Sequence, residues 1–340
     1  MLFGISTTSY SQKEELGNAF KNKNFEKVIS ICDRILKNNP TDTDALLGIG
    51  KSYNSLKQFD KAIPYLITLS ENTNKDWEFS WSYTELVESY FAIGNKEKSL
   101  EFYNKAKQFK GTKNSKKKLK KLELLFGFDS LYNDWKTIET DNVIFHFQDA
   151  SAIKNIEFYI KEREKAFVSI NSFFNSKLPK KIDFFVWKNQ NEAQKILGLK
   201  IVLGFAKPMY CITHNHPKQS TGHEIAHNIS HWFNKPVKKT RFINEGVGVY
   251  FDQSNVNRIL IAKKVLNTQP LDIVDIWKNG RSYSDRILYP VGGAFVEQLI
   301  LFDKDKFLKL CINQTYENAQ VIYGSELENI ISNFNNQLNK

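Results

Sequence analysis

HEIAHNISHWF, at residues 223–233, is the stretch of sequence that decides the fold of the second half of the chain. At about 100° per residue, His223 and His227 lie about 40° apart on successive turns of a helix, so both imidazoles can reach one cation. Glu224 lies to the side of that pair, where its carboxylate can meet a water molecule at the cation. The opposite face is apolar, with Ile225, Ile229, Trp232 and Phe233. The stretch therefore predicts a helix that buries one face and presents two metal ligands and a base on the other.

A zinc site with two histidines needs a third protein ligand and an open position for water. His231 lies on the same helix face, but a rise of about 1.5 Å per residue puts it about 12 Å from His223, too far for one ion. A histidine after a glycine turn is also excluded, because Phe233 stands where it would fall. The better candidate is Glu245, within RFINEGVGVY at 241–250. There the carboxylate stands in the first turn of a second predicted helix, and glycines after it allow close packing on the first.

Composition narrows the class of protein. The 340-residue chain is 41% hydrophobic and contains Phe 26, Tyr 14 and Trp 6, which excludes whole-chain disorder. No apolar run is long enough to span a membrane. The cysteines Cys32, Cys211 and Cys311 are far apart and odd in number, which excludes a disulfide framework and a CxxC metal site. The net charge of +11 comes from lysine in an asparagine-rich chain, and we expect no nucleic-acid partner from it.

The N-terminus is either the end of a signal peptide or a disordered tail. Residues 1–11 read MLFGISTTSYS, with a short apolar stretch and then a small-x-small pattern at 9–11, but without a basic segment before them. A truncated signal peptide predicts export to the periplasm or cell envelope, and a disordered tail predicts a cytoplasmic protein.

Residues 12–110 repeat a helical pattern. Phe25 and Val28 recur as Phe59 and Ala62, an offset of 34, and a third copy follows at an offset of 37. Each unit predicts a helix pair that cannot bury its apolar face alone, so neighbouring units must stack. The basic stretch at 111–134 follows, with seven lysines between 110 and 121, and predicts a helical linker with a solvated face.

The region 135–340 mixes strand and helix patterns. Strands are predicted at 143–147, 182–187 and 209–213. Helices are predicted at 152–175, 220–233, 242–253, 256–267, 288–302 and 323–337. Strands first and helices afterwards indicate the α+β class.

Two resemblances follow from these motifs. The 34-residue period, with small residues where helices cross and aromatics beside them, resembles the tetratricopeptide repeat. His223–His227 followed by Asn244-Glu245-Gly246 resembles the gluzincin metallopeptidases, and especially the peptidase MA-like domain, over roughly 135–312. Together the two resemblances imply a helical solenoid followed by a thermolysin-like domain, which is an α + (α+β) architecture.

The gluzincin resemblance also implies the roles of individual residues. His223, His227 and Glu245 are the implied ligands of one zinc ion per chain, and Glu224 is the implied general base. Two features depart from the family. Val249 stands where thermolysin-like enzymes carry an Asp that holds a ligand histidine, and no motif before His223 anchors a substrate amino terminus.

The expected function is a zinc endopeptidase that hydrolyses a protein or peptide, while the repeats recruit the substrate or a partner protein. The alternative for the repeats is a spacer that only packs on the next domain. Tyr289 is the first candidate for the oxyanion donor, and Tyr283 and His231 are the next candidates. The alternative role for Tyr289 is that of a core aromatic residue. An extended substrate is expected to pair with the strand predicted near 209–213. The alternative from another class is an inactive zinc-binding scaffold for protein–protein interaction.

Overall fold

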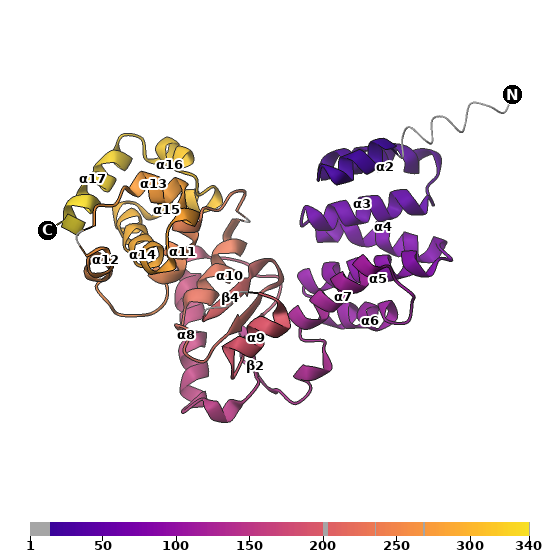
Figure 1. Ribbon diagram of the computed structural model, residues 1–340, viewed down its shortest axis with the longest axis horizontal. Helices are drawn as coiled ribbons and strands as arrows, with labels where there is room; N and C mark the ends of the chain where they lie inside the picture. The colour runs from indigo at the N-terminus through magenta and orange to yellow at the C-terminus, as the bar shows by residue number, and fades with distance from the viewer. Residues whose placement is uncertain (1–13, 200–202, 235, 268, 340) are drawn as a thin grey trace. The chain divides into compact units, whose positions relative to one another are not determined.

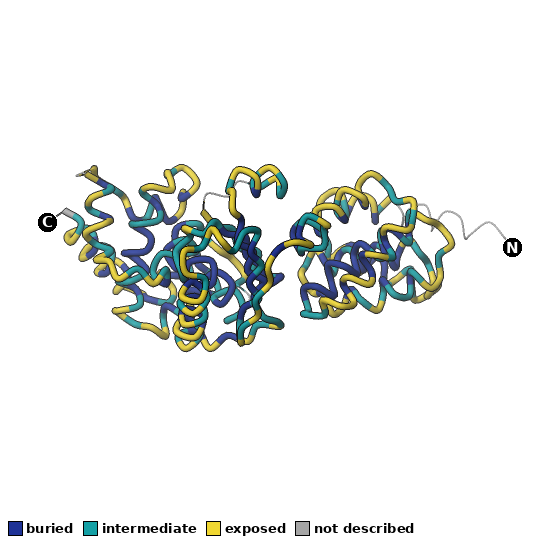
Figure 2. Tube along the Cα trace, turned by 90° about the horizontal axis from the view of Figure 1, so that it is seen from below, coloured by how far each residue is buried: buried dark blue, intermediate teal, exposed yellow. Residues whose placement is uncertain are grey.

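A computed structural model describes residues 14–199, 203–234, 236–267 and 269–339 (Figure 1). The segment 1–11, with its expected signal-peptide remnant or tail, lies outside the described residues. The chain divides into two compact units between Asn133 and Asp134. Figure 2 shows buried residues along the inner helices of the first unit and along the inner strands and helices of the second.

The first unit is helical. Helical residues 14–21 are followed by α2 (Phe25–Asn38), α3 (Thr43–Ser55), α4 (Phe59–Asn72), α5 (Asp76–Ala92), α6 (Lys96–Ala106), α7 (Lys113–Leu125) and a 3-10 turn at Ser130–Tyr132. From α2 to α6 each helix packs on the next, and α5 also contacts α3 and α7. Side-chain oxygens cap several N-termini, as Asn24 does by accepting the Lys27 N–H at 3.0 Å. At Gly50 the crossing is tight, because an added Cβ would lie 2.5 Å from Leu66 Cδ2.

Helix α7, in the segment expected to be a linker, packs on α5 within the first unit. Its Leu119, Leu122 and Leu125 are buried. Lys118 lies between two buried carboxylates of α5, with its ammonium 2.6 Å from both Glu85 and Glu88. At least this lysine of the basic stretch therefore compensates buried acids and does not lie on a solvated face.

The second unit is built on one mixed sheet. Its strands are β1 (Lys136–Glu139), β2 (Val143–Phe147), β3 (Ile182–Val186), β4 (Gly204–Lys207) and β5 (Ile212–Asn215). Their order is β1-β2-β3-β5-β4, and the two inner pairs are parallel while both outer strands are antiparallel to their neighbours. Strand β4 is thus an edge strand.

Both faces of the sheet are covered. On one face Phe145 and Phe184 join a core shared with α8 and with the apolar side of α10. On the other face Phe185 stacks between the rings of His146 and His214, with centroid distances of 4.4 and 4.6 Å. Residues of β3 therefore alternate between the apolar core and a mixed aromatic and polar layer, in which Asp183 pairs with His146 and Lys180, and all five are buried.

The helices of this unit lie between the strands and after them in the sequence. They are α8 (Ile156–Phe174), α9 (Gln190–Leu197), α10 (His223–Asn234), α11 (Arg241–Tyr250), α12 (Arg258–Leu266), α13 (Ile273–Lys278), α14 (Asp285–Phe302), α15 (Lys304–Ile312), α16 (Tyr316–Tyr323) and α17 (Glu326–Asn339). Short 3-10 helices occur at Ala150–Ala152, Pro208–Tyr210 and Gly280–Ser282. Helix α11 packs between α10 and α14. Among the described helices, none is long and apolar enough to cross a membrane.

The mainly helical chain with a small mixed sheet agrees with the α+β class expected for the second region. The strands expected at 143–147 and 182–187 are β2 and β3. The strand expected at 209–213 is wrong in its bounds and its place. Its first residues form a 3-10 helix, and β5 lies inside the sheet between β3 and β4. The backbone groups of β5 are therefore already paired with β3 on one side and β4 on the other.

Candidate metal centre

Two glycines bring α10 and α11 together. A Cβ on Gly222, just before α10, would overlap the carbonyl oxygen of Phe251 at the end of α11. A Cβ on Gly248 would lie 2.6 Å from Cε1 and 2.7 Å from Nε2 of His223. Only glycine leaves room for these approaches. The apolar face of α10 is anchored as its pattern predicts, with Ile225 and Ile229 fully buried.

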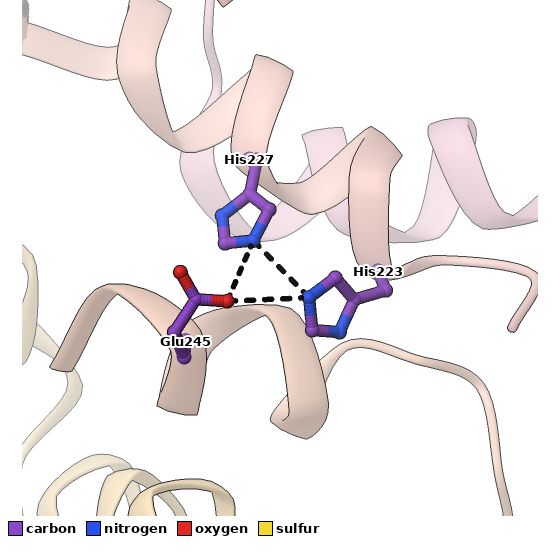
Figure 3. A group of neighbouring side chains, drawn as sticks. All are labelled: His223, His227 and Glu245. Atoms are coloured by element: carbon purple, nitrogen blue, oxygen red, sulfur yellow. Dashed lines mark hydrogen bonds and ion pairs between the residues drawn. The ribbon is translucent and has the colours of Figure 1, made fainter. Parts of the chain in front are cut away.

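Three ligand atoms from these helices converge on one point (Figure 3). The Nε2 atoms of His223 and His227 are 3.2 Å apart, and they lie 3.6 and 3.5 Å from Oε2 of Glu245. Ligands about 2.0–2.1 Å from a tetrahedral zinc ion lie about 3.3 Å from one another. The observed separations of 3.2, 3.5 and 3.6 Å match that spacing. The donor set and its spacing therefore fit a zinc ion with three protein ligands and room for a fourth.

The charges of the three groups are coupled. Burial opposes ionisation of Glu245, but the adjacent imidazoles of His227 and His223 hold the pKa of that carboxyl well below its usual range. Burial likewise opposes the charged form of His223, yet the carboxylates of Glu245 and Glu224 raise the pKa of His223 above its ordinary value. A partly buried carboxylate facing two imidazoles is thus ready to balance a cation.

A further polar side chain contacts the ligand His227. The amide Nδ2 of Asn244 lies 3.4 Å from His227 Nδ1. The same amide nitrogen donates to Oε1 of Glu245 at 3.4 Å, so Asn244 contacts two of the three candidate ligands. Asn244 can therefore orient His227.

Glu224 lies beside the ligand triangle. Its side chain is 5% exposed, and its Oε1 accepts a hydrogen bond from Nε2 of Gln219 at 2.7 Å. A Cβ on Gly204 of β4 would overlap the same carboxylate oxygen. The carboxylate therefore lies directly against the backbone of the edge strand.

A cavity of about 1010 Å³ contains this centre. Its walls include the three ligands, Glu224, Gln219 and the first residues of β4. The His216 N–H donates to the Leu203 carbonyl at 2.7 Å, and Phe205 pairs with His214. Because such pairs alternate in an antiparallel ladder, the N–H and C=O groups of Gly204 and Ala206 point away from β5. No described strand pairs with that outer edge.

Of the three candidate oxyanion donors, only one lies at the cavity. Tyr289 of α14 lines the cavity with its ring stacked beside that of His223, at a centroid distance of 5.9 Å, and burial together with the charge of Glu245 raises the pKa of its phenol. The hydroxyl of Tyr283 instead donates to Asp275. Neither Tyr283 nor His231 is among the described residues that line the cavity, and the His231 ring packs edge-on against Trp232. Of the three, only Tyr289 faces the ligands.

The cavity wall also carries several charges. Its basic residues are Lys218, Lys239, Arg241 and Arg286, and its acidic residues are Glu224, Glu245 and Asp285. Arg241 pairs with Asp285 and also donates to the carbonyls of Gly280 and Tyr283 at 3.1 Å. Each carboxylate in the described wall is therefore already engaged by a neighbouring side chain.

Sequence reasoning missed Gln219, Gly204 and Asn244 as contributors to the centre. Gln219 and Gly204 belong to segments without a periodic pattern, and Asn244 was noted only as part of the motif around Glu245. No protein-family model matches the chain, and no curated protein is significantly similar to it in sequence.

Proposed function

We propose that this protein is a zinc-dependent endopeptidase, with His223, His227 and Glu245 holding one zinc ion and Glu224 as general base. One observation carries the proposal. Three donor atoms at the spacing of tetrahedral zinc ligands, a separate buried carboxylate and a strand edge that no described strand pairs line one cavity. A zinc ion held by the three donors, Glu224 as base and the strand edge would each serve the hydrolysis of an extended peptide.

A bound zinc ion supplies a Lewis acid and lowers the pKa of a water molecule in its open position toward about 7. Glu224 takes a proton from the attacking water as its oxygen bonds to the scissile carbonyl carbon. When the C–N bond breaks, Glu224 passes that proton to the leaving nitrogen, so the products are a carboxylic acid and an amine. Tyr289 can donate a hydrogen bond to the developing oxyanion, since it lines the same cavity with its ring beside that of His223.

The substrate class follows from β4. The outward N–H and C=O groups of Gly204 and Ala206 can pair with an extended peptide by strand addition. Such a peptide would pass over Glu224, which packs against Gly204. An aminopeptidase needs a free carboxylate for the substrate's ammonium group, but in the described wall Asp285 is paired with Arg241. Internal cleavage is therefore the better-supported outcome.

We also propose that the second unit is a gluzincin of the peptidase MA-like type and that the first is a tetratricopeptide-like solenoid. The repeat spacing, the successive packing from α2 to α6 and the tight crossing at Gly50 support the second assignment. In this proposal the repeats bring a protein substrate or partner to the peptidase unit.

Zinc content and protein cleavage measured on one preparation test the proposal. The purified chain should carry one zinc ion, and it should cleave unfolded casein in a reaction that a chelator abolishes and added zinc restores. Glu245→Ala should lose the zinc and the activity together. Glu139→Ala is a matched control, because Glu139 is an acid of the same unit that forms an ion pair with Lys181. A chain that binds zinc but cleaves nothing would support the scaffold alternative.

A further inference from the structure

We propose that Gln219 is a positioning residue for Glu224 and that the buried Arg163 holds Gln219 in place. The inference rests on the proposed function, because it concerns the base of that reaction. It adds two residues outside the metal-binding helices, one on the loop between β5 and α10 and one on α8.

The Gln219 side chain has a defined orientation. Its Oε1 accepts the backbone N–H of Ser220 at 3.2 Å, so its Nε2 is the atom that faces Glu224, at 2.7 Å from Oε1 of the carboxylate. The amide thus occupies one carboxylate oxygen and leaves the other for proton transfer. An added Cβ on Gly204 would lie 2.6 Å from the amide nitrogen, so β4 closes the third side of this contact.

The loop that carries Gln219 is fastened on both sides. The Gln219 N–H donates to the His216 carbonyl at 2.9 Å, and the Gln219 carbonyl accepts Nη2 of Arg163 at 2.8 Å. His216 is in turn bound to Leu203 beside β4. These bonds tie the loop to the edge strand and to α8.

Arg163 is an unusual buried cation. It is 4% exposed, its guanidinium packs 3.3 Å above the ring of Tyr159, and its Nε has no hydrogen-bond partner among the described residues. No carboxylate of the described chain forms an ion pair with it, and its second hydrogen bond goes to the Tyr159 carbonyl at 3.3 Å. Burying a charge without an acid destabilises a fold. That charge strengthens the hydrogen bond to the Gln219 carbonyl, since a cation binds a carbonyl oxygen more strongly than a neutral donor does.

Gln219 would affect the reaction by orienting the carboxylate of Glu224. Glu224 must meet the attacking water first and the leaving nitrogen second, so a carboxylate that turns freely spends less time in the productive orientation. Removing the amide of Gln219 should therefore slow turnover and leave substrate and zinc binding as they were.

The experiment compares variants of the full zinc-loaded chain on one quenched fluorogenic peptide, chosen as the best-cleaved member of a casein digest. Gln219→Ala should lower kcat about 10- to 100-fold with KM and zinc affinity unchanged. Gln148→Ala is the matched control, because Gln148 also binds a backbone group through its amide, accepting the Lys188 N–H at 2.8 Å, but lies outside the cavity wall. Unchanged kcat in Gln219→Ala would overturn the inference.

Arg163 is tested by comparison with Arg258. Arg258 also donates to a backbone carbonyl, that of Tyr250 at 2.8 Å, and lies over the same residue's ring, but it does not line the cavity. Arg163→Met should lower kcat as Gln219→Ala does, and Arg163→Lys should restore part of it. Arg258→Met should lower the melting temperature without this loss of kcat. If Arg163→Met does not fold, Arg163→Lys against Arg258→Lys makes the same comparison, and equal kcat values would refute the role of Arg163.

A readout without turnover separates this inference from the proposed function. In ¹⁵N-labelled protein, the side-chain amide signals of Gln219, identified by their loss in Gln219→Glu, should shift when Glu224 is changed to Ala. They should not shift in Glu192→Ala, which removes an exposed acid. Absence of the shift would refute the contact, whether or not the wild-type chain cleaves peptides. A chain with the shift but without cleavage would refute only the proposed function.

Discussion

Gly248→Ala should weaken zinc binding without removing a ligand. The added methyl would lie 2.6 Å from Cε1, 2.7 Å from Nε2 and 2.8 Å from Nδ1 of His223, so it would press on the face of the ring. Carbon atoms in contact are separated by at least about 3.5 Å, which means that the ring must retreat by about 0.9 Å. Zinc sites tolerate errors of about 0.2 Å in ligand distance.

The expected magnitude follows from that displacement. Disturbing the surroundings of a ligand histidine typically lowers metal affinity about 10- to 100-fold, or about 1.4–2.7 kcal/mol. Alanine also favours the helix over glycine by about 1 kcal/mol, so α11 itself should not be lost. Competition with a chromophoric chelator measures the zinc affinity, and circular dichroism confirms the helix content.

Gly50→Ala provides the matched control. Its Cβ would be crowded to a similar degree, 2.5 Å from Leu66 Cδ2, but in the first unit. It should lower the melting temperature and leave zinc affinity unchanged. Unchanged zinc affinity in Gly248→Ala would show that His223 is not held against α11 as described, and the geometry of the ligand triangle would then be in error.

Three further outcomes are expected. Lys118→Met should lower the free energy of unfolding by about 3 kcal/mol in urea titrations, because it leaves Glu85 and Glu88 buried without their shared cation; a loss below about 1 kcal/mol would mean that solvent already compensates them. Burial raises the pKa of the Cys32, Cys211 and Cys311 thiols to about 12, so at pH 8 the reactive thiolate is rare and a thiol-reactive disulfide should detect no thiol before unfolding and three after it. Tyr289→Phe should keep zinc and lower kcat about 10²- to 10³-fold if its hydroxyl stabilises the oxyanion, whereas unchanged kcat would make it a packing residue.

The helices of the candidate centre could be predicted because their chemistry and their periodicity coincide. In α10 the candidate metal ligands alternate with apolar residues at helical spacing, and the structure buries Ile225 and Ile229 on the far side. The candidate Glu245 was found from the motif around it. Its distance of 3.5 Å from His227 depends on a helix crossing that the spacing alone does not specify.

Other parts left no periodic signal. Strand β4 is four residues that include a glycine, and α13 is a single six-residue helix, so neither is long enough to show a pattern. Gln219 acts through a contact made by a loop, which depends on tertiary structure. The place of α7 also depends on tertiary contacts. Its lysine-rich sequence indicates a solvated helix, but in the structure Lys118 pairs with buried acids of α5.

Glu224→Gln tests the central claim most directly. The amide keeps the size of the side chain, but it cannot accept a proton from water. Zinc content, melting temperature and peptide hydrolysis should be measured on the same preparations of wild type and variant. We expect equal zinc and equal melting temperature, with hydrolysis slowed about 10²- to 10⁴-fold and toward the upper end, since one group serves both proton transfers. Hydrolysis at the wild-type rate would contradict the assignment of Glu224 as the base, and with it the proposal that this centre is a peptidase.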